Sequence, residues 1–459
     1  MASALENRHL AELHGLADEL GVEGFRMLSK QDLVAAILER DPDAEDKLPA
    51  APEPDPDDVD DGDRASSAEA ERNQARGRGG SGRGRSRGGG RRPREEEPAE
   101  GEDEADAGEP VTGVLDITPR GHGFIRLSGL GSTDDDDVYV SPSQIRRCEM
   151  QRGDEISGPA RRPRRGERYP ALVHVDAING VEPGEGRPRL ADATPVRPSR
   201  RIELAAGDVP DADAVTLRAI DLLAPLAHGQ RVLVRAAPGA GRTTLLRALG
   251  RALAPREEIE LVVLLIDERP EELEDWREAV PGADLAVATA DMRSGEQLRL
   301  VELALGRVAR RAEAGADVVL LVDSLSRIAA AADEPGRVKP IFGAGRETAE
   351  EGIGSLTVIA TVLADADDEG GVERAVATTE SSLIALDRDL AAAGTFPPLA
   401  LAAFRITGGE ELRDEADLAA VRALRGELAA LPPAEAVAEL RRRIEGSPDN
   451  RALLDSLAG

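Results

Sequence analysis

A glycine-rich turn at residues 238–244 carries the clearest chemical signal in the sequence. Its letters, PGAGRTT, follow the apolar run RVLVRAA (231–237) and precede the helical pattern LLRALGRAL (245–253). At such a turn the backbone N–H groups bind phosphate, and the dipole of the following helix favours negative charge. The usual pattern, G-x-x-x-x-G-K-[ST], adds a lysine for the terminal phosphates and a hydroxyl for Mg²⁺. Here Ala236 takes the first glycine position and Arg242 the lysine position, so the turn predicts a phosphate site with an incomplete pattern.

Acidic residues follow two apolar runs further along the chain. The run ELVVLLI (260–266) is followed by Asp-Glu-Arg with Glu268 in the middle, and the run ADVVLLV is followed by Asp323. An acid at the end of such a run holds Mg²⁺ beside a phosphate loop, together with a hydroxyl such as that of Thr243. Ligands bind at the carboxyl ends of parallel strands, where Glu268 could position an attacking water. The alternative, acids that merely end strands at the surface, is less common for two such sites after a phosphate loop.

The few aromatic residues are informative by their position. The chain has eight, and Phe124, Tyr139 and Tyr169 fall in one segment rich in glycine and proline. Strand alternation would place His122, Phe124 and Arg126 on one face. Exposed rings flanked by arginines are how small β-barrels bind single-stranded nucleic acid. Rings that simply fill a barrel core are the alternative, and the polar residues on the same face favour nucleic-acid binding.

The pattern also indicates the elements that must hold these residues. Leucines at helical spacing predict a small helical module at 1–40, and the near absence of large apolar side chains predicts a disordered linker at 41–110. Short β-rich runs at 111–185 predict a small antiparallel barrel or sheet. After a connector at 186–214, apolar runs alternate with helical patterns over 215–459, which predicts parallel βαβ units with helices on both faces of a sheet.

Charge and composition restrict the function classes. The formal net charge of −30 by itself argues against a polyanionic partner, because nucleic-acid binding neutralises phosphates. The charge is uneven, however: residues 111–201 sum to +2 and residues 202–459 to −18. Within the acidic linker, residues 72–94 carry nine arginines and eight glycines, and either a solubilising linker or an RNA-binding arm fits them. A nucleic-acid partner for the barrel segment therefore stays open.

The single cysteine, Cys148, excludes a disulfide scaffold and a zinc module held by cysteines. A reducing cytoplasm is the expected location. The first residues lack the pattern of a secretory signal, and no apolar run is long enough for a membrane helix, so we expect no membrane partner.

With these motifs the chain resembles bacterial transcription termination factor Rho, a ring-forming, RNA-dependent ATPase and helicase. The resemblance covers nearly the whole chain outside the linker. The segments that carry it are GFRMLSKQDLVAAIL (24–38), DVYVSPSQIRR (137–147), RGDEISG (152–158), GERYPALV (166–173), LLIDERPEEL (264–273), DSLSRIA (323–329) and FGAGRETAEEGIGSLTVIAT (342–361). The resemblance implies a multidomain α/β fold, with a cold-shock or OB-type RNA-binding barrel followed by a RecA-like ATPase domain. It also implies ATP and Mg²⁺ as cofactors, single-stranded RNA as partner and a hexameric ring of identical subunits, with RNA polymerase as a candidate partner.

The resemblance assigns site residues as well. Those implied for RNA binding are Gly121, His122, Gly123, Phe124, Ile125, Arg126, Asp137, Val138, Tyr139, Glu167, Arg168 and Tyr169. Those implied for nucleotide binding are Ala227, His228, Gly229, Gln230, Arg231, Val232, Gly239, Ala240, Gly241, Arg242, Thr243, Thr244 and Arg269. Glu268 is the implied catalytic carboxylate, and Thr243 and Asp323 are the expected metal-binding pair.

Several positions depart from the family pattern. His122 stands where the family has a stacking phenylalanine, and Gly239 and Arg242 replace the two lysines of the phosphate loop. Between Ile328 and Phe342 the chain is shorter than the family, and the loop that contacts RNA in the central pore is missing.

The arginine finger of the family has no counterpart near Gly408, although Arg388 or Arg405 could replace it. Such a finger contributes about 10³–10⁵ in rate in GTPases. Two hypotheses follow. The chain is either an ATP-driven RNA translocase that ends transcription, or a Rho paralogue that binds RNA and nucleotide but hydrolyses slowly and acts as an RNA-binding or regulatory protein.

Overall fold

The computed structural model describes residues 34, 36, 37, 40, 108–130, 135–184, 186–204, 211–364 and 371–458. The chain divides into two compact units, Met1–Glu96 and Glu97–Gly459, and the second holds every element named below. The predicted helical module and linker, with the Arg-Gly stretch, lie almost entirely outside the described residues. Among the described residues, no helix is both long and apolar enough to cross a membrane.

The predicted barrel is present and begins at Glu109. Its elements are β1 (Glu109–Ile117), β2 (Gly123–Arg126), β3 (Val138–Val140), α4 (Pro142–Arg147), β4 (Glu155–Arg161), β5 (Ala171–Leu172) and β6 (Ala177–Ile178). The strand order is β1-β2-β3-β5-β4, and β4 pairs back with β1, which closes the barrel. Alternate residues point inward, so Leu115, Ile125 and Ile156 fill the core while their neighbours face outward.

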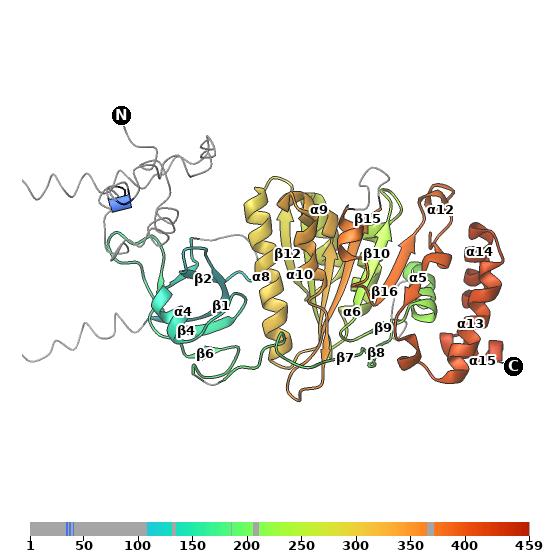
Figure 1. Ribbon diagram of the computed structural model, residues 1–459, viewed down its shortest axis with the longest axis horizontal. Coiled ribbons are helices and arrows are strands. Elements are labelled where there is room, and N and C mark those ends of the chain that lie inside the picture. Colours follow the sequence, from blue (N-terminus) through green and yellow to red (C-terminus); the bar gives the residue numbers. More distant parts are fainter. Residues whose placement is uncertain are drawn as a thin grey trace, which may run out of the picture. The chain divides into compact units, whose positions relative to one another are not determined.

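The connector contains β7 (Pro195–Val196) and β8 (Arg201–Ile202) and leads to the predicted parallel sheet. The sheet has the order β12-β11-β13-β15-β10-β16-β17, and only the short β17 runs antiparallel to its neighbour (Figure 1). Its strands are β10 (Arg231–Ala236), β11 (Glu260–Glu268), β12 (Asp284–Thr289), β13 (Val318–Asp323), β15 (Leu356–Leu363), β16 (Ser382–Leu386) and β17 (Arg405–Ile406). Outside this sheet, β9 (Leu226–Ala227) pairs with β8, and β14 (Glu347–Thr348) pairs with β7. Every residue of β13 is buried, as a central parallel strand requires.

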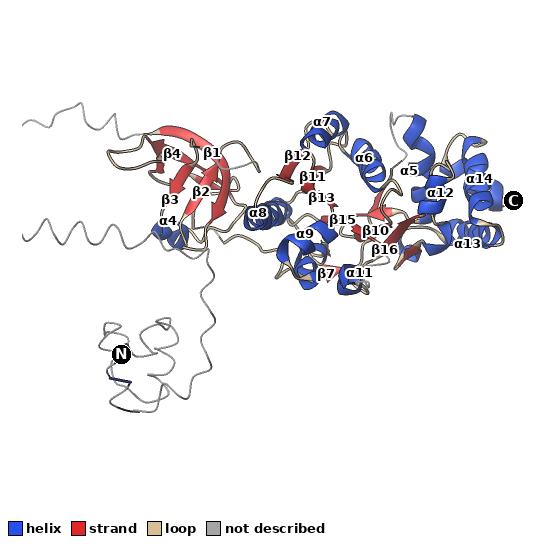
Figure 2. Ribbon diagram, turned by 90° about the horizontal axis from the view of Figure 1, so that it is seen from above, coloured by secondary structure: helices blue, strands red, loops and turns tan. Residues whose placement is uncertain are grey.

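Helices cover both faces of this sheet. Figure 2 shows α6 and α7 on one face and α8 and α9 on the other, and each pair packs on its own apolar cluster. The helices of this domain are α5 (Asp211–Leu223), α6 (Arg242–Leu253), α7 (Pro270–Ala279), α8 (Ser294–Glu313), α9 (Leu325–Ala332), α10 (Lys339–Phe342), α11 (Gly371–Val376), α12 (Arg388–Ala392), α13 (Glu415–Ala429), α14 (Pro433–Glu445) and α15 (Asn450–Ala458), with 3-10 turns η4 (Pro335–Val338), η5 (Leu401–Ala403) and η6 (Gly409–Glu411).

The barrel lies directly against α8. Gly153 has φ +87°, and a Cβ on it would lie 2.2 Å from the backbone nitrogen of Arg307. A Cβ on Gly306 would lie 2.5 Å from the carbonyl oxygen of Arg152, so two glycines allow the two backbones to meet. Beside this contact, Arg299 of α8 donates to the buried carboxylate of Asp116 in β1 over 2.7 Å. The barrel is therefore held to the sheet domain by close backbone packing and by ion pairs.

Candidate nucleotide and RNA sites

The phosphate loop joins β10 to α6, as predicted. Gly239 and Gly241 have φ +79° and +90°, and a Cβ on Gly239 would meet no atom within 4 Å. Gly241 is the N-cap of α6, and no side chain caps the first N–H groups of that helix. Open space, left-handed glycines and uncapped N–H groups together form a cradle that fits a phosphate group.

Asp323 lies at the end of β13, beside this loop, and is 1% exposed. The hydroxyl Oγ1 of Thr243 donates to its Oδ2 over 3.1 Å, and Oγ1 of Thr361 donates to its Oδ1 over 3.2 Å. The Nε atom of Arg242 lies 2.9 Å from the same Oδ1. The structure thus brings Arg242 and Thr243 beside Asp323, which is distant from them in sequence, as the predicted site requires.

Glu268 ends β11, the neighbour of β13, where Leu265 pairs with Asp323. Glu268 is 5% exposed, and Nη1 of Arg327 donates to its Oε2 over 2.7 Å. The same nitrogen donates to the carbonyl oxygen of Ile266 over 3.1 Å, which fixes the position of the guanidinium. Arg327 therefore holds Glu268 in one orientation at the carboxyl edge of the sheet, a role that the sequence did not indicate.

A pocket of about 250 Å³ adjoins the phosphate loop, and sequence reasoning missed it. Gly241 and Thr244 line one side, and Phe396 and Pro397 from the segment after α12 line another. Phe396 is 43% exposed, which is unusual for a large apolar side chain. Thr216 of α5 also lines the pocket, and among the described residues its buried Oγ1 has no hydrogen-bond partner. The only sequence signal was that one of five phenylalanines precedes two prolines.

The assignment of Ala227 to Val232 as nucleotide contacts needs correction. These residues run from β9 to the start of β10, whereas the phosphate loop follows the end of β10. Four to six strand residues, roughly 13–20 Å, therefore separate them from the loop. Gly229 donates its N–H to Thr357 Oγ1 over 2.9 Å, and Arg231 donates to the carbonyl oxygens of Thr379 and Gly345. Within one subunit these residues cannot contact the same nucleotide as the loop.

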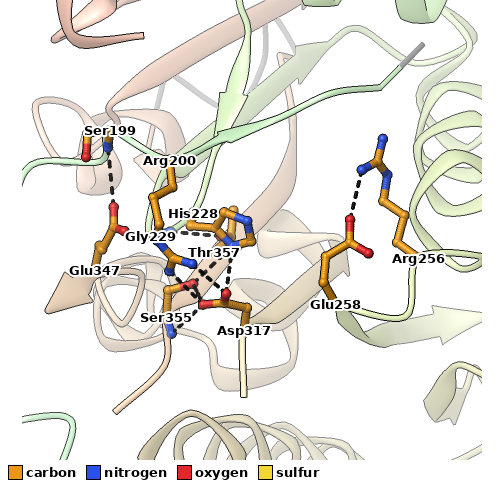
Figure 3. Close-up of polar contacts among 10 residues, drawn as sticks. All are labelled: Ser199, Arg200, His228, Gly229, Arg256, Glu258, Asp317, Glu347, Ser355 and Thr357. Carbon is orange, nitrogen blue, oxygen red and sulfur yellow. Dashed lines mark hydrogen bonds and ion pairs between the residues drawn. The ribbon is translucent and has the colours of Figure 1, made fainter. Parts of the chain in front are cut away.

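Two of them, His228 and Gly229, belong to a polar cluster at the amino edge of the sheet, drawn in Figure 3. Arg200 of the connector donates to both oxygens of Asp317, over 2.7 and 2.8 Å, and to Glu347 over 2.5 Å. Burial opposes ionisation of Asp317, but the hydrogen bonds from Arg200 and Ser355 bring its pKa down to about 2. For His228, burial disfavours the charged imidazolium and lowers the pKa, although its Nδ1 lies 3.7 Å from Asp317. This cluster attaches the connector to the sheet.

On the barrel, the predicted rings form one continuous group. The ring centroids of Phe124 and Tyr169 are 5.0 Å apart, and those of Phe124 and Tyr139 are 5.9 Å apart. The His122 ring lies 5.6 Å from Phe124 and 5.7 Å from Tyr139. All four residues are partly exposed, and the guanidinium of Arg168 lies 5.1 Å from the centroid of Tyr169. The rings therefore form an open aromatic surface with a cation at its edge.

Several residues assigned to RNA binding lie beneath this surface and need correction. Arg126 is 5% exposed and forms ion pairs with Asp116 and Asp137, both of which are buried. Its guanidinium lies 5.9 Å from the Phe124 centroid, so it supports the ring from below. Ile125 and Val138 belong to the barrel core. Strand alternation predicted the correct face of the strand for Arg126, but it did not predict that the side chain is buried beneath the rings.

The remaining RNA assignments lie in or near the exposed surface. Gly121 is partly exposed in the turn before β2, and Gly123 is buried at the start of that strand. Glu167 is exposed, and hydrogen bonds from Arg161 and from the backbone of Arg164 lower its pKa to about 2. In the ATPase domain, Ala240 is buried within the phosphate loop, and Arg269 is exposed as the N-cap of α7.

Comparison with known families agrees with this architecture. Residues 111–184 match the model described as Rho termination factor, RNA-binding domain, and residues 4–45 match Rho termination factor, N-terminal domain. Residues 216–339 match the ATP synthase alpha/beta family, nucleotide-binding domain. The predicted fold class, with an OB-type RNA-binding barrel and a RecA-like ATPase domain, is confirmed.

Curated relatives cover most of the chain. The transcription termination factor Rho of Chromobacterium violaceum is 34% identical over 380 residues, which cover 77% of this chain and 90% of the relative. The factor of Aquifex aeolicus is 33% identical over 76% of this chain and 84% of its own length. The factor of Bacillus subtilis is 31% identical over 86% of this chain and 82% of its own length. On this evidence the chain belongs to the transcription termination factor Rho family.

Proposed function

We propose that the chain is an RNA-dependent ATPase and RNA helicase that binds nascent single-stranded RNA and drives transcription termination as a hexameric ring in the cytoplasm. The observation that most supports this proposal is that one compact unit holds both an open aromatic surface on a closed barrel and a phosphate loop beside Asp323 and Glu268. RNA polymerase remains a candidate partner of this activity.

Single-stranded RNA would lie across the rings of Phe124, Tyr139 and Tyr169. Stacked bases contribute about 1–3 kcal/mol each, and the stacking tolerates any sequence. Arg168 at the edge would contact a phosphate, because its side chain is exposed and Asp135, its partner at 2.8 Å, is exposed as well. An ion pair between exposed groups is weak and can be exchanged for a phosphate contact.

ATP would place its phosphates on the N–H groups at the start of α6, with the base in the adjoining pocket. There Phe396 offers an exposed ring for stacking, and Thr216 offers a hydroxyl that lacks a partner among the described residues. Glu268, held by Arg327, would orient the attacking water. The predicted Mg²⁺ is not part of this step, because both oxygens of Asp323 are already engaged by Arg242, Thr243 and Thr361.

The second hypothesis, an RNA-binding relative without a working motor, is favoured by different observations. The described residues 325–342 fold almost entirely into α9, η4 and α10, which leaves only Asp333 and Glu334 outside a helical element. A long RNA-contacting loop is therefore absent from this stretch. For the motor hypothesis, in contrast, Arg388 and Arg405 are both exposed, and Arg405 lies 3.5 Å from Glu380, so either could serve a neighbouring subunit as an arginine finger.

ATP hydrolysis by the purified full chain, measured with and without poly(C) in a buffer that contains Mg²⁺, separates the two hypotheses. The motor hypothesis predicts RNA-stimulated turnover that is lost in Glu268→Ala. Turnover no faster than that of Glu268→Ala, together with intact RNA binding, would favour the relative without a motor.

A further inference from the structure

The position of Arg242 has consequences for the cation that the nucleotide needs. Arg242 is the first residue of α6, and its side chain is only 12% exposed. Its Nε lies 2.9 Å from Oδ1 of Asp323, whose Oδ2 accepts from Thr243. Asp323 contacts no other basic side chain among the described residues. The counter-charge of this buried carboxylate therefore comes from the chain itself.

This arrangement differs from the usual phosphate loop, in which the hydroxyl and the acid serve a divalent cation. A buried carboxylate needs a partner charge, and either a metal ion or a guanidinium can supply it. Here the guanidinium already does so, and Thr361 Oγ1 takes a further position on Oδ1 at 3.2 Å. A Mg²⁺ ion at Asp323 would have to displace Arg242. Because Arg242, Thr243 and Thr361 already occupy both of its oxygens, the carboxylate of Asp323 does not fit a metal ion.

The same guanidinium has donors to spare. Among the described residues, Nη1 of Arg242 is buried and makes no hydrogen bond, whereas Nε has the ion pair with Asp323. A guanidinium carries five N–H donors in a fixed fork, whereas the ammonium of lysine has a single nitrogen. Buried donors without an acceptor are costly, and a phosphate oxygen on the adjacent N–H groups of the loop would satisfy them. One arginine can thus serve the carboxylate and the phosphate together.

We propose that Arg242 replaces the divalent cation at Asp323, so that the chain binds nucleotide phosphates without Mg²⁺. In the bound state the guanidinium stays beside Asp323 as its counter-charge through Nε and donates to a phosphate oxygen through Nη1, the buried nitrogen that lacks a partner. The inference rests on the proposed function, because it takes the loop at Gly239 to Thr244 to be a nucleotide site.

Calorimetric titration of the full chain with ATP, once with Mg²⁺ and once with EDTA, tests the proposal. The dissociation constants in the two buffers should agree within about threefold, or about 0.7 kcal/mol. A parent chain that binds ATP at least about tenfold more weakly in EDTA would overturn the proposal and leave the nucleotide site standing. No binding in either buffer would refute the proposed nucleotide site itself. This comparison uses the parent chain, so it does not depend on a variant that folds.

Two variants and one control sharpen the test. Arg242→Lys supplies one nitrogen and should acquire Mg²⁺ dependence of at least about tenfold. Asp323→Asn frees Arg242 for the phosphate and should bind ATP in EDTA at least as well as the parent. Weaker ATP binding by Asp323→Asn than by the parent in the Mg²⁺ buffer, with equal binding in EDTA, would instead indicate that Asp323 is a metal ligand and would overturn the proposal. The control is Arg247→Lys. Arg247 lies on the same helix but pairs with Glu272 and Asp275, so this variant should bind ATP as the parent does in both buffers.

Discussion

Replacing Tyr169 by alanine removes one ring from the aromatic surface of the barrel. Tyr169 touches this surface through Phe124, at a centroid distance of 5.0 Å, and through Arg168, whose guanidinium lies 5.1 Å from its ring. Because Tyr169 is partly exposed and lies outside the apolar core of the barrel, the variant should fold. Its effect is therefore expected on RNA binding and not on stability.

The magnitude follows from the loss of one stacked base. At about 1–3 kcal/mol for a base on an aromatic ring, the dissociation constant for single-stranded RNA should rise roughly 5- to 150-fold. Tyr169→Phe keeps the ring and should bind as the parent does. The ring carries no charge, so the factor should be similar at every salt concentration. Removing the charge in Arg168→Ala should instead lower the slope of log K against log salt by about 0.7.

Filter binding of a cytidine oligomer to the full chain, over a series of salt concentrations, provides the measurement. Parent-like affinity of Tyr169→Ala would refute the placement of RNA on these rings. An equal loss in Tyr169→Phe would show that the hydroxyl, and not stacking, carries the contact.

Three further predictions concern stability. His228 has a pKa held below its ordinary value of about 6.5, so its neutral form favours the folded chain, and its contribution to stability should be lost as the pH falls below about 6.5. The contribution of Asp317, with a pKa of about 2, should be present above about pH 4 and lost as the pH falls toward 2. Urea unfolding at about pH 7.5 and 5.5 should show a larger drop in the free energy of unfolding for the parent than for His228→Asn, and equal drops would contradict this. Gly306→Ala, whose Cβ would lie 2.5 Å from the carbonyl oxygen of Arg152, should lower the free energy of unfolding by about 1–3 kcal/mol. Gly426→Ala on α13, where a Cβ meets nothing within 4 Å, is the matched control and should stabilise the chain by up to about 1 kcal/mol.

The sequence pattern predicted the parallel sheet and the meeting of Thr243 with Asp323, because local patterns determine these features. Apolar runs ending in an acid indicated β11 and β13, and parallel strands bring their carboxyl ends to one edge. Part of the aromatic surface was predicted for a similar reason, since alternation along β2 and β3 gives the faces of Phe124 and Tyr139, whereas Tyr169 lies in the loop before β5.

Other parts of the sites depend on contacts between distant segments, which no local pattern encodes. Phe396 reaches the phosphate loop only through the fold of the segment after α12. The burial of Arg126 depends on Asp116 and Asp137, and strand alternation says nothing about such partners. Family resemblance placed His228 in the nucleotide site, whereas the length of β10 puts it at the other edge of the sheet.

The guanidinium in the phosphate loop also changes how the site can be regulated. The chain has three lysines, Lys30, Lys47 and Lys339, and none lies in the loop. Acetylation neutralises lysine but not arginine, so an acetyltransferase that would silence the usual loop has no target here. The cation that faces the nucleotide is therefore closed to control by acetylation, and any regulation of this site must use another route.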